Sequence, residues 1–174
     1  MNITFMPLSE SHFPLLLQWL ESPHVKKWWD QHIHWTPELI QQKYGTYVKG
    51  YKMENGISKP ISAYIICIDE KPIGYIQIYN AYDFSRDPPL VGLPESLAAF
   101  DIFIGEADYL KRGLGPKAIT IFLDQYAVSY SHVFVNPDSA NVAAIHAYEK
   151  AGFNKIEYQP NAKEIWMLRR KTIT

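Results

Sequence analysis

A short glycine-rich turn decides the fold of this sequence. Two glycines two positions apart let the backbone turn sharply and leave amide hydrogens unobstructed. A helix that begins there points its positive end outward, and three basic side chains add formal charge. These features predict a cradle for a diphosphate; the alternative is an ordinary helix start with solvated lysines. The turn covers residues 111–117 and consists of Lys111-Arg112-Gly113-Leu114-Gly115-Pro116-Lys117.

Two other phosphate-binding turns compete with this interpretation. A P-loop needs two glycines separated by four residues and followed by Lys-Ser/Thr, and that pattern is absent. A dinucleotide-binding turn of the form Gly-x-Gly-x-x-Gly/Ala is nominally present at Gly113, Gly115 and Ala118. Such a turn directly follows its strand, however, and here residues 106–112 intervene. We therefore discount both.

Hydrophobic spacing on either side of the turn predicts strands interleaved with helices. Ser9, with His12 at the capping-box position, and Thr36, which precedes a proline, mark two helix N-termini. Ser139 or Asn141 begins a helix after the turn. The predicted strands are 3–6, 62–69, 72–79, 97–104, 132–135, 153–158 and 164–170; the predicted helices cover about 9–20, 36–49, 117–126 and 141–151, and 54–60 is a predicted loop.

The composition fits one globular domain spanning residues 1–174. Hydrophobic residues make up 47% and charged residues 20%, which excludes a disordered chain. The formal net charge of −1 gives no reason to expect a nucleic-acid-binding face, and no run is long and apolar enough to span a bilayer. The one cysteine, Cys67, excludes a disulfide framework and a cysteine–zinc cluster. We expect no metal site and a reduced, cytoplasmic setting.

The segment downstream of the turn carries the most specific resemblance to a known family. Asn141, Ala144, Ile145 and the stretch 148–153, together with the turn and its spacing, resemble the GCN5-related N-acetyltransferase (GNAT) family. The resemblance covers nearly the whole chain. Its closest subgroup is the aminoglycoside 6′-N-acetyltransferases, to which residues 28–29, 71–75, 100–101 and 112–115 are also similar. Two positions depart from the pattern: Leu110 stands where the family usually has Gln or Arg, and Asn136 where the subgroup often has Asp.

The resemblance implies a GNAT fold of the α/β (α+β) class. Its mixed, mostly antiparallel sheet would have six or seven strands and be flanked by about four helices. The acetyl donor would be acetyl-CoA, with its diphosphate on the turn and its pantetheine arm along backbone groups of the fourth strand. The cofactor-binding residues expected on this basis are Ile102, Phe103, Ile104, Lys111, Arg112, Gly113, Leu114, Gly115, Pro116, Lys117, Asn141, Ala144 and Tyr148.

Direct attack of an amine on a thioester needs a proton acceptor and a proton donor. Asp101 is the candidate acceptor, although strand alternation leaves open which face of the sheet it occupies. The resemblance places a tyrosine at the cofactor sulfur, and here that residue is Tyr148. It lies two helical turns after Asn141, so both share one helix face. The alternatives are a solvated strand aspartate and a tyrosine that only packs in the core.

The charge pattern predicts a cationic amine substrate. Residues 80–110 contain six acidic residues and one basic residue, Arg86, and the sign reverses at Lys111. This asymmetry fits a cleft that takes a cation at one end and an anionic cofactor at the other. Tryptophans can stack on sugar faces or cations; the alternatives are a solvated acidic loop and core packing of one tryptophan. The predicted substrate-binding residues are Trp28, Trp29, Asp83, Asp87, Asp101 and Asn136.

These expectations combine into one function. The predicted protein is a cytoplasmic, acetyl-CoA-dependent N-acetyltransferase, a monomer or homodimer, that acts on a small-molecule primary amine and has no nucleic-acid or membrane partner. The leading substrate is the 6′-amine of an aminoglycoside, which would make it an antibiotic-resistance enzyme. The alternatives are a GNAT acetyltransferase for another amine (a hydroxylysine siderophore precursor, a polyamine or a protein N-terminus) and a non-catalytic acyl-CoA-binding module.

Overall fold

The structure, a computed structural model, describes residues 1–172 of the chain. Two compact units make it up. The first contains residues 1–77 and 102–112, and the second contains residues 78–101 and the chain from Gly113 onward. Each unit is described separately below. The prediction that residues 1–174 form a single domain stays a prediction.

Seven strands form one mixed sheet, as predicted. The pairs β1–β4, β7–β9 and β8–β9 are antiparallel, whereas β6 and β7 are parallel. The parallel pair requires a crossover between its strands, and α4 supplies it. In spatial order the strands are β1 (Ile3–Pro7), β4 (Ser62–Ile68), β5 (Lys71–Asn80), β6 (Leu97–Ile104), β7 (His132–Val135), β9 (Met167–Arg170) and β8 (Asn154–Lys155).

Two helix starts of the first unit, after Ser9 and after Thr36, are as predicted, whereas the short helices at 23–26 and 107–109 lie where none was predicted. The ring nitrogen Nδ1 of His12 accepts the Ser9 amide at 3.0 Å, so histidine serves the capping-box position. The Thr36 hydroxyl accepts the Leu39 amide at 3.2 Å and caps the second long helix. These elements are η1 (Glu10–His12), α1 (Phe13–Leu20), the single turn α2 (Pro23–Lys26), α3 (Pro37–Val48) and, farther along the chain, η3 (Ala107–Tyr109).

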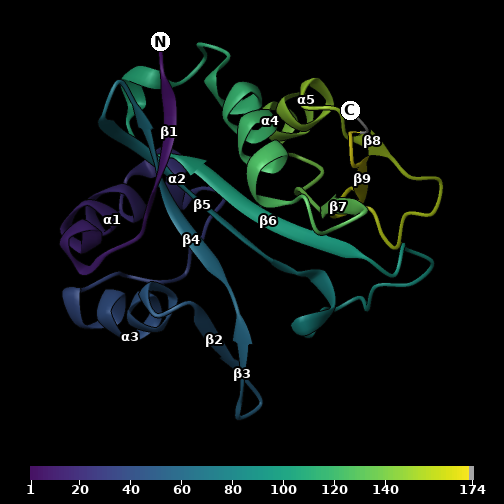
Figure 1. The fold of residues 1–174 in the computed structure, drawn as a ribbon, viewed down its shortest axis with the longest axis horizontal. Helices are drawn as coiled ribbons and strands as arrows, with labels where there is room; N and C mark the ends of the chain where they lie inside the picture. The colour runs from purple at the N-terminus through teal and green to yellow at the C-terminus, as the bar shows by residue number, and fades with distance from the viewer. Residues whose placement is uncertain (173–174) are drawn as a thin grey trace. The chain divides into compact units, whose positions relative to one another are not determined.

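The predicted loop at 54–60 is wrong. Strands β2 (Tyr51–Glu54) and β3 (Ile57–Pro60) pair there as an antiparallel hairpin, which is visible near α3 in Figure 1. Asn55 and Gly56 connect the strands, with φ values of 50° and 79°. An Asn-Gly pair with both φ angles positive is the preferred two-residue hairpin turn, and the sequence analysis overlooked it.

The second unit contains α4 (Leu114–Tyr126), α5 (Val142–Lys150) and the short η2 (Ala81–Asp83). Helices α4 and α5 lie side by side (Figure 1). The predicted start of α4 at 117 is wrong by three residues, because Gly113 adopts the left-handed conformation (φ 72°) and the helix begins immediately after it. Pro116 fits inside the first turn, where amide hydrogens have no acceptor within the helix.

Both ends of the last helix are as predicted, but the closing strands are shorter. Asn141 caps α5, and Gly152 follows the helix with φ 94°, which is the conformation that a helix C-terminus favours for glycine. The predicted strands 153–158 and 164–170 are reduced to β8 and β9. Among residues 1–172, four α-helices have eight or more residues, in agreement with the predicted number.

Aromatic rings fill the core of the first unit. The ring of Phe103 stacks on Tyr75 at a centroid distance of 5.5 Å and meets the edge of Trp19 at 6.1 Å. Tyr44 meets Tyr75 edge-on at 5.7 Å. A Cβ at Gly105 would lie 2.2 Å from the Trp19 ring, so only glycine fits beside this ring.

The core of the second unit is formed by side chains of its strands and of the segments next to them. Phe134 and Trp166, both 1% exposed, meet edge-on at 5.4 Å and pack with Ala81, Leu97 and Ala99. Tyr79 lies against this cluster, half-buried. No helix within residues 1–172 has the length and apolar character needed to cross a membrane.

Candidate active site

Asp101 lies within a polar network of the second unit. It comes from β6, and its carboxylate accepts a hydrogen bond of 3.0 Å from the hydroxyl of Tyr79, near the end of β5. The Tyr79 oxygen in turn accepts a long hydrogen bond, 3.4 Å, from the Arg86 guanidinium. Asp101 is half-buried and therefore differs from a fully solvated strand aspartate.

Tyr148 is the second predicted catalytic residue, and it is electrostatically linked to the first. Its half-buried ring meets Phe100 and Phe153 at centroid distances of 5.8 Å. Burial, and then the negative charge of Asp101, raise the pKa of the Tyr148 hydroxyl. The hydroxyl therefore keeps its proton throughout the neutral range and retains the proton that a donor needs.

Asn136 also belongs to this network. Its side-chain oxygen accepts a long hydrogen bond, 3.5 Å, from Arg86, and its amide nitrogen donates to Glu164 at 3.2 Å. The other Glu164 oxygen accepts the Trp166 indole N–H at 2.8 Å. Two predicted residues, Asp101 and Asn136, are thus linked by hydrogen bonds through Tyr79 and Arg86, and the third, Tyr148, is affected by the charge of Asp101.

The sequence analysis missed three members of the network: Tyr79, Arg86 and Glu164. A signal existed for Arg86 alone, because it is the one basic residue among six acidic ones in residues 80–110. Tyr79 and Glu164 lie 22 and 28 residues from their partners in the chain. No local spacing indicates such contacts.

Two predicted substrate residues lie elsewhere. Asp83 is half-buried, and after burial its charge is the second cause that raises the pKa of Tyr130. Asp87 is exposed and precedes Pro88 across a cis peptide bond. Their predicted contact with the substrate remains a prediction.

The glycine turn has the open geometry that a diphosphate requires. A Cβ at Gly113 or Gly115 would meet nothing within 4 Å, so the space beside the helix start is clear. The amides of Leu114 and Gly115 lie in the first turn of α4, where helical amides lack intrahelical acceptors and favour anions. Pro116 has no amide hydrogen to contribute.

The basic residues beside the turn are exposed. Lys111 has a left-handed backbone, φ 58°. Arg112 lies over the Tyr109 ring at 5.0 Å and donates to the Asp108 carbonyl at 3.3 Å, so part of its guanidinium orders its own loop. Lys117 lies in the first turn of α4. Their exposure is compatible with ion pairing to a phosphate and also with simple solvation.

Asn141 uses its side chain within its own helix. Its oxygen accepts the Ala144 amide at 3.2 Å, which caps α5. The predicted hydrogen bond from Asn141 to the pantetheine arm would therefore have to come from its side-chain NH₂ group. Ala144 and Asn141 are both half-buried.

The end of β6 in the first unit supplies the predicted backbone groups of Ile102, Phe103 and Ile104. A Cβ at Gly74 would lie 2.4 Å from the Phe103 carbonyl oxygen, so glycine is required for this close approach. The Ile104 carbonyl already accepts a hydrogen bond of 3.0 Å from the His24 ring. Pairing of this strand with pantetheine stays a prediction.

The two adjacent tryptophans differ in environment. Trp29 is half-buried and meets Phe103 and Tyr75 edge-on at 5.0 and 6.0 Å. Trp28 is 41% exposed, and Lys27 lies over its ring at 5.1 Å. Core packing thus applies to Trp29, whereas the larger exposed ring surface belongs to Trp28.

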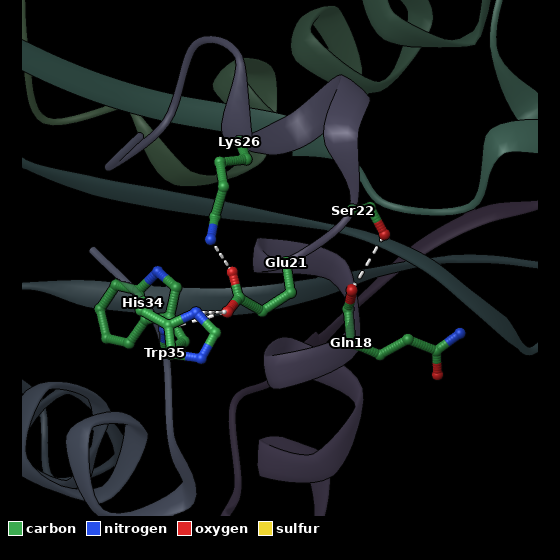
Figure 2. Close-up of polar contacts among 6 residues, drawn as sticks. All are labelled: Gln18, Glu21, Ser22, Lys26, His34 and Trp35. Carbon is green, nitrogen blue, oxygen red and sulfur yellow. Dashed lines mark hydrogen bonds and ion pairs between the residues drawn. The ribbon is translucent and has the colours of Figure 1, made fainter. Parts of the chain in front are cut away.

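One carboxylate closes the segment that carries these tryptophans, as Figure 2 shows. Glu21, which follows α1, pairs with Lys26 through one oxygen. Its other oxygen accepts the Trp35 amide at 3.2 Å and lies 3.1 Å from Nδ1 of His34. Residues 22–34 are therefore closed into a loop by a single side chain, which we call the Glu21 clasp.

The described residues favour acid–base chemistry. No group of three or more His, Cys, Asp or Glu side chains within residues 1–172 could hold a metal ion. Asp101 provides an acceptor for a proton and Tyr148 provides a donor. This pair suits a transfer in which a nucleophile loses a proton and a leaving group gains one.

Comparison with known proteins identifies related chains. A family model for an acetyltransferase (GNAT) domain matches residues 9–160. The aminoglycoside N(6′)-acetyltransferases type 1 of Klebsiella pneumoniae and of Serratia marcescens are each 26% identical over 164 residues, covering 88% of this chain and 75% of the relative.

Solved structures show the same fold. The structure of AAC(6′)-Ib in complex with paromomycin and acetyl-CoA superposes with a TM-score of 0.81 at 22% identity, covering 98% of this chain and 94% of the other. The same enzyme with coenzyme A and kanamycin gives a TM-score of 0.80 at 23% identity, covering 98% and 95%. The α/β architecture with a mostly antiparallel sheet is thereby confirmed.

Proposed function

Because the chain belongs to the GNAT acetyltransferase family, we propose that it transfers the acetyl group of acetyl-CoA to the 6′-amine of an aminoglycoside. The substrate assignment is supported by the relatives of K. pneumoniae and S. marcescens, whose names carry this activity. The single observation that carries the proposal is the half-buried Asp101 carboxylate, which the Tyr79 hydroxyl holds at 3.0 Å and whose charge helps to keep the proton on Tyr148, since amine acetylation requires a proton acceptor and a proton donor.

In the proposed reaction, Asp101 accepts the proton that the amine must lose, directly or through a water molecule. The amine nitrogen forms a bond to the thioester carbon, and the carbon–sulfur bond breaks. Tyr148 donates a proton to the departing sulfur. The products are the amide and the free coenzyme A thiol; the proton taken up by Asp101 leaves to solvent and Tyr148 regains one from solvent, so both groups are restored and no oxidant or reductant is needed.

The donor would be held by the residues predicted for it. The open space beside Gly113 and Gly115 and the first amides of α4 suit the diphosphate, with Lys111, Arg112 and Lys117 as counter-charges. Backbone groups of 102–104 would align the arm, and one amide would polarise the thioester carbonyl. On the acceptor side, Asn136 and the exposed Trp28 are the proposed contacts.

The experiment that tests this function measures thiol release from acetyl-CoA in the presence of an amine panel. Kanamycin-type aminoglycosides with a free 6′-amine should react, and analogues lacking that amine should not. Spermidine, an N-hydroxylysine precursor and a peptide N-terminus form the comparison set. If one of them reacted faster than kanamycin, that amine would replace the aminoglycoside as the assigned substrate. Acetyl-CoA binding without any turnover would indicate a non-catalytic binding module.

A further inference from the structure

The Tyr79 hydroxyl stands between Asp101 and the one basic residue of segment 80–110. Its oxygen lies 3.0 Å from the Asp101 carboxylate and 3.4 Å from an Arg86 nitrogen. A guanidinium can only donate and a carboxylate can only accept. The single phenolic proton must therefore point at Asp101, so this chain of hydrogen bonds has one direction.

The far end of this chain is anchored in the core of the second unit. The Arg86 guanidinium lies over the ring of Phe134 at 5.3 Å and donates to Asn136. Asn136 is held by Glu164, and Glu164 by the indole of Trp166. Phe134 and Trp166 are each 1% exposed. These buried rings therefore hold the Arg86 guanidinium in place beside Tyr79.

From this geometry we propose that Tyr79 and Arg86 are positioning residues: they hold the Asp101 carboxylate in its charged form and in one orientation. The inference rests on the proposed function, in which Asp101 accepts the amine proton. A carboxylate held by a donated hydrogen bond and a nearby cation resists both protonation and rotation. Tyr79 contacts Asp101, and Arg86 contacts Tyr79. Neither residue takes the amine proton itself.

The charges around Asp101 agree with this role. Tyr79 faces it from β5, Tyr148 from α5, and Arg86 approaches through Tyr79; Glu164 lies farther along the network. Burial, followed by the Asp101 charge, raises the pKa of Tyr79, whereas Arg86 opposes that rise. Tyr79 therefore stays a hydrogen-bond donor across the range in which the reaction would run.

The first test replaces Tyr79 by Phe, which removes one oxygen. We expect kcat to fall about tenfold, the loss typical of one hydrogen bond to a charged group, with the KM for acetyl-CoA unchanged. The acidic limb of the rate–pH profile should move to higher pH. Tyr82→Phe is the matched control, because the Tyr82 hydroxyl binds the carbonyls of Leu93 and Pro94 instead of Asp101.

The second test separates charge from packing at Arg86. Arg86→Met keeps an apolar stem over Phe134 but removes the cation, and should shift the acidic limb in the same direction as Tyr79→Phe. Arg86→Lys keeps a positive charge, so its acidic limb should lie between those of the wild type and Arg86→Met. Wild-type profiles in both Tyr79→Phe and Arg86→Met, or an equal loss of kcat in Tyr82→Phe, would overturn the inference.

A readout without turnover distinguishes this inference from the proposed function. The ¹³C resonance of the Asp101 carboxyl group can be followed by NMR against pH in the wild type and in Tyr79→Phe. A higher titration midpoint in the variant supports the positioning role even if kanamycin is not the substrate. An unchanged midpoint rejects the role even if the wild type acetylates kanamycin, and a variant that unfolds leaves Arg86→Lys and Arg86→Met to decide by the same measurement.

Discussion

The two units of the chain use aromatic residues differently. In the first unit, Trp19, Tyr75 and Phe103 pack ring against ring in the core. In the second unit, Tyr79 and Trp166 also pack, but their polar atoms lie on one continuous path that runs from Asp101 to Glu164.

The difference separates residues that mainly stabilise the fold from residues that mainly affect the proposed reaction. Ring contacts are short-ranged, so the loss of one ring mainly costs stability. A connected polar network in a partly dry interior couples its members, so the loss of one member alters the others. Changes in the ring core of the first unit should therefore move the free energy of unfolding, and changes in the network should move kcat and its pH dependence.

The largest expected effect comes from the proton acceptor. Asp101→Asn keeps the shape and an oxygen that can still accept from Tyr79, but it cannot take a proton from the amine. We expect kcat to fall about 100-fold or more, whereas the Kd for acetyl-CoA stays near its original value. Steady-state kinetics and calorimetry measure the two quantities, and equal turnover in the variant would remove Asp101 from its proposed role.

Trp19→Ala tests whether the packed rings of the first unit stabilise the fold. The Trp19 ring is 0% exposed, and its loss should lower the free energy of unfolding by about 3–5 kcal/mol. Trp28→Ala is the matched control, because the 41% exposed ring of Trp28 lies outside that core and should change stability by under about 1 kcal/mol. Urea denaturation measures both; similar losses would contradict the description of Trp19 as the supporting ring.

A smaller effect is expected at the glycine turn. Lys111→Glu reverses an exposed charge beside the helix start and should weaken acetyl-CoA binding about tenfold, with greater loss at low salt. Lys49→Glu makes the same charge change at an exposed position after α3. If calorimetry gives equal acetyl-CoA affinities for the two variants, Lys111 is merely solvated.

The smallest effect concerns the buried hydroxyls at high pH. The pKa values of Tyr79 and Tyr148 are raised in the folded chain, whereas an unfolded tyrosine titrates near about 10. Above that pH the unfolded chain has released protons that the folded chain still holds, so stability falls as pH rises. The melting temperature of Tyr148→Phe should fall less steeply between pH 9 and 11 than that of the wild type (roughly the range around that value); parallel curves would contradict the assignment.

Local signals made much of the fold predictable. Thr36 before Pro37, and Asn141 before α5, cap helices because their side chains bond to amides within three residues. Strand 97–104 matched β6 because seven of its eight residues are apolar and its first four are buried. The hairpin at Asn55-Gly56 was also predictable, since Asn-Gly is a preferred sequence for a two-residue hairpin turn.

The candidate site was less predictable, for a physical reason. Asp101 and Tyr148 were found through a family pattern, and strand alternation alone could not tell which face Asp101 occupies. The Tyr79–Arg86–Asn136 connection depends on the fold of η2 and the segment after it, which places Arg86 beside both Tyr79 and Asn136. Contacts across 7 and 50 residues are set by tertiary packing, which residue spacing does not encode.

The Glu21 clasp has a consequence for how this chain can vary. One side chain joins the two ends of segment 22–34, and His24 and Trp29 anchor its interior, so only the exposed stretch next to Trp28 is open to change in length. Loop-closure entropy grows slowly with length, by about 0.6 kcal/mol for each doubling. Insertions next to Trp28 could therefore reshape the surface that carries this ring while α1 and α3 keep their places, provided that Glu21 is retained.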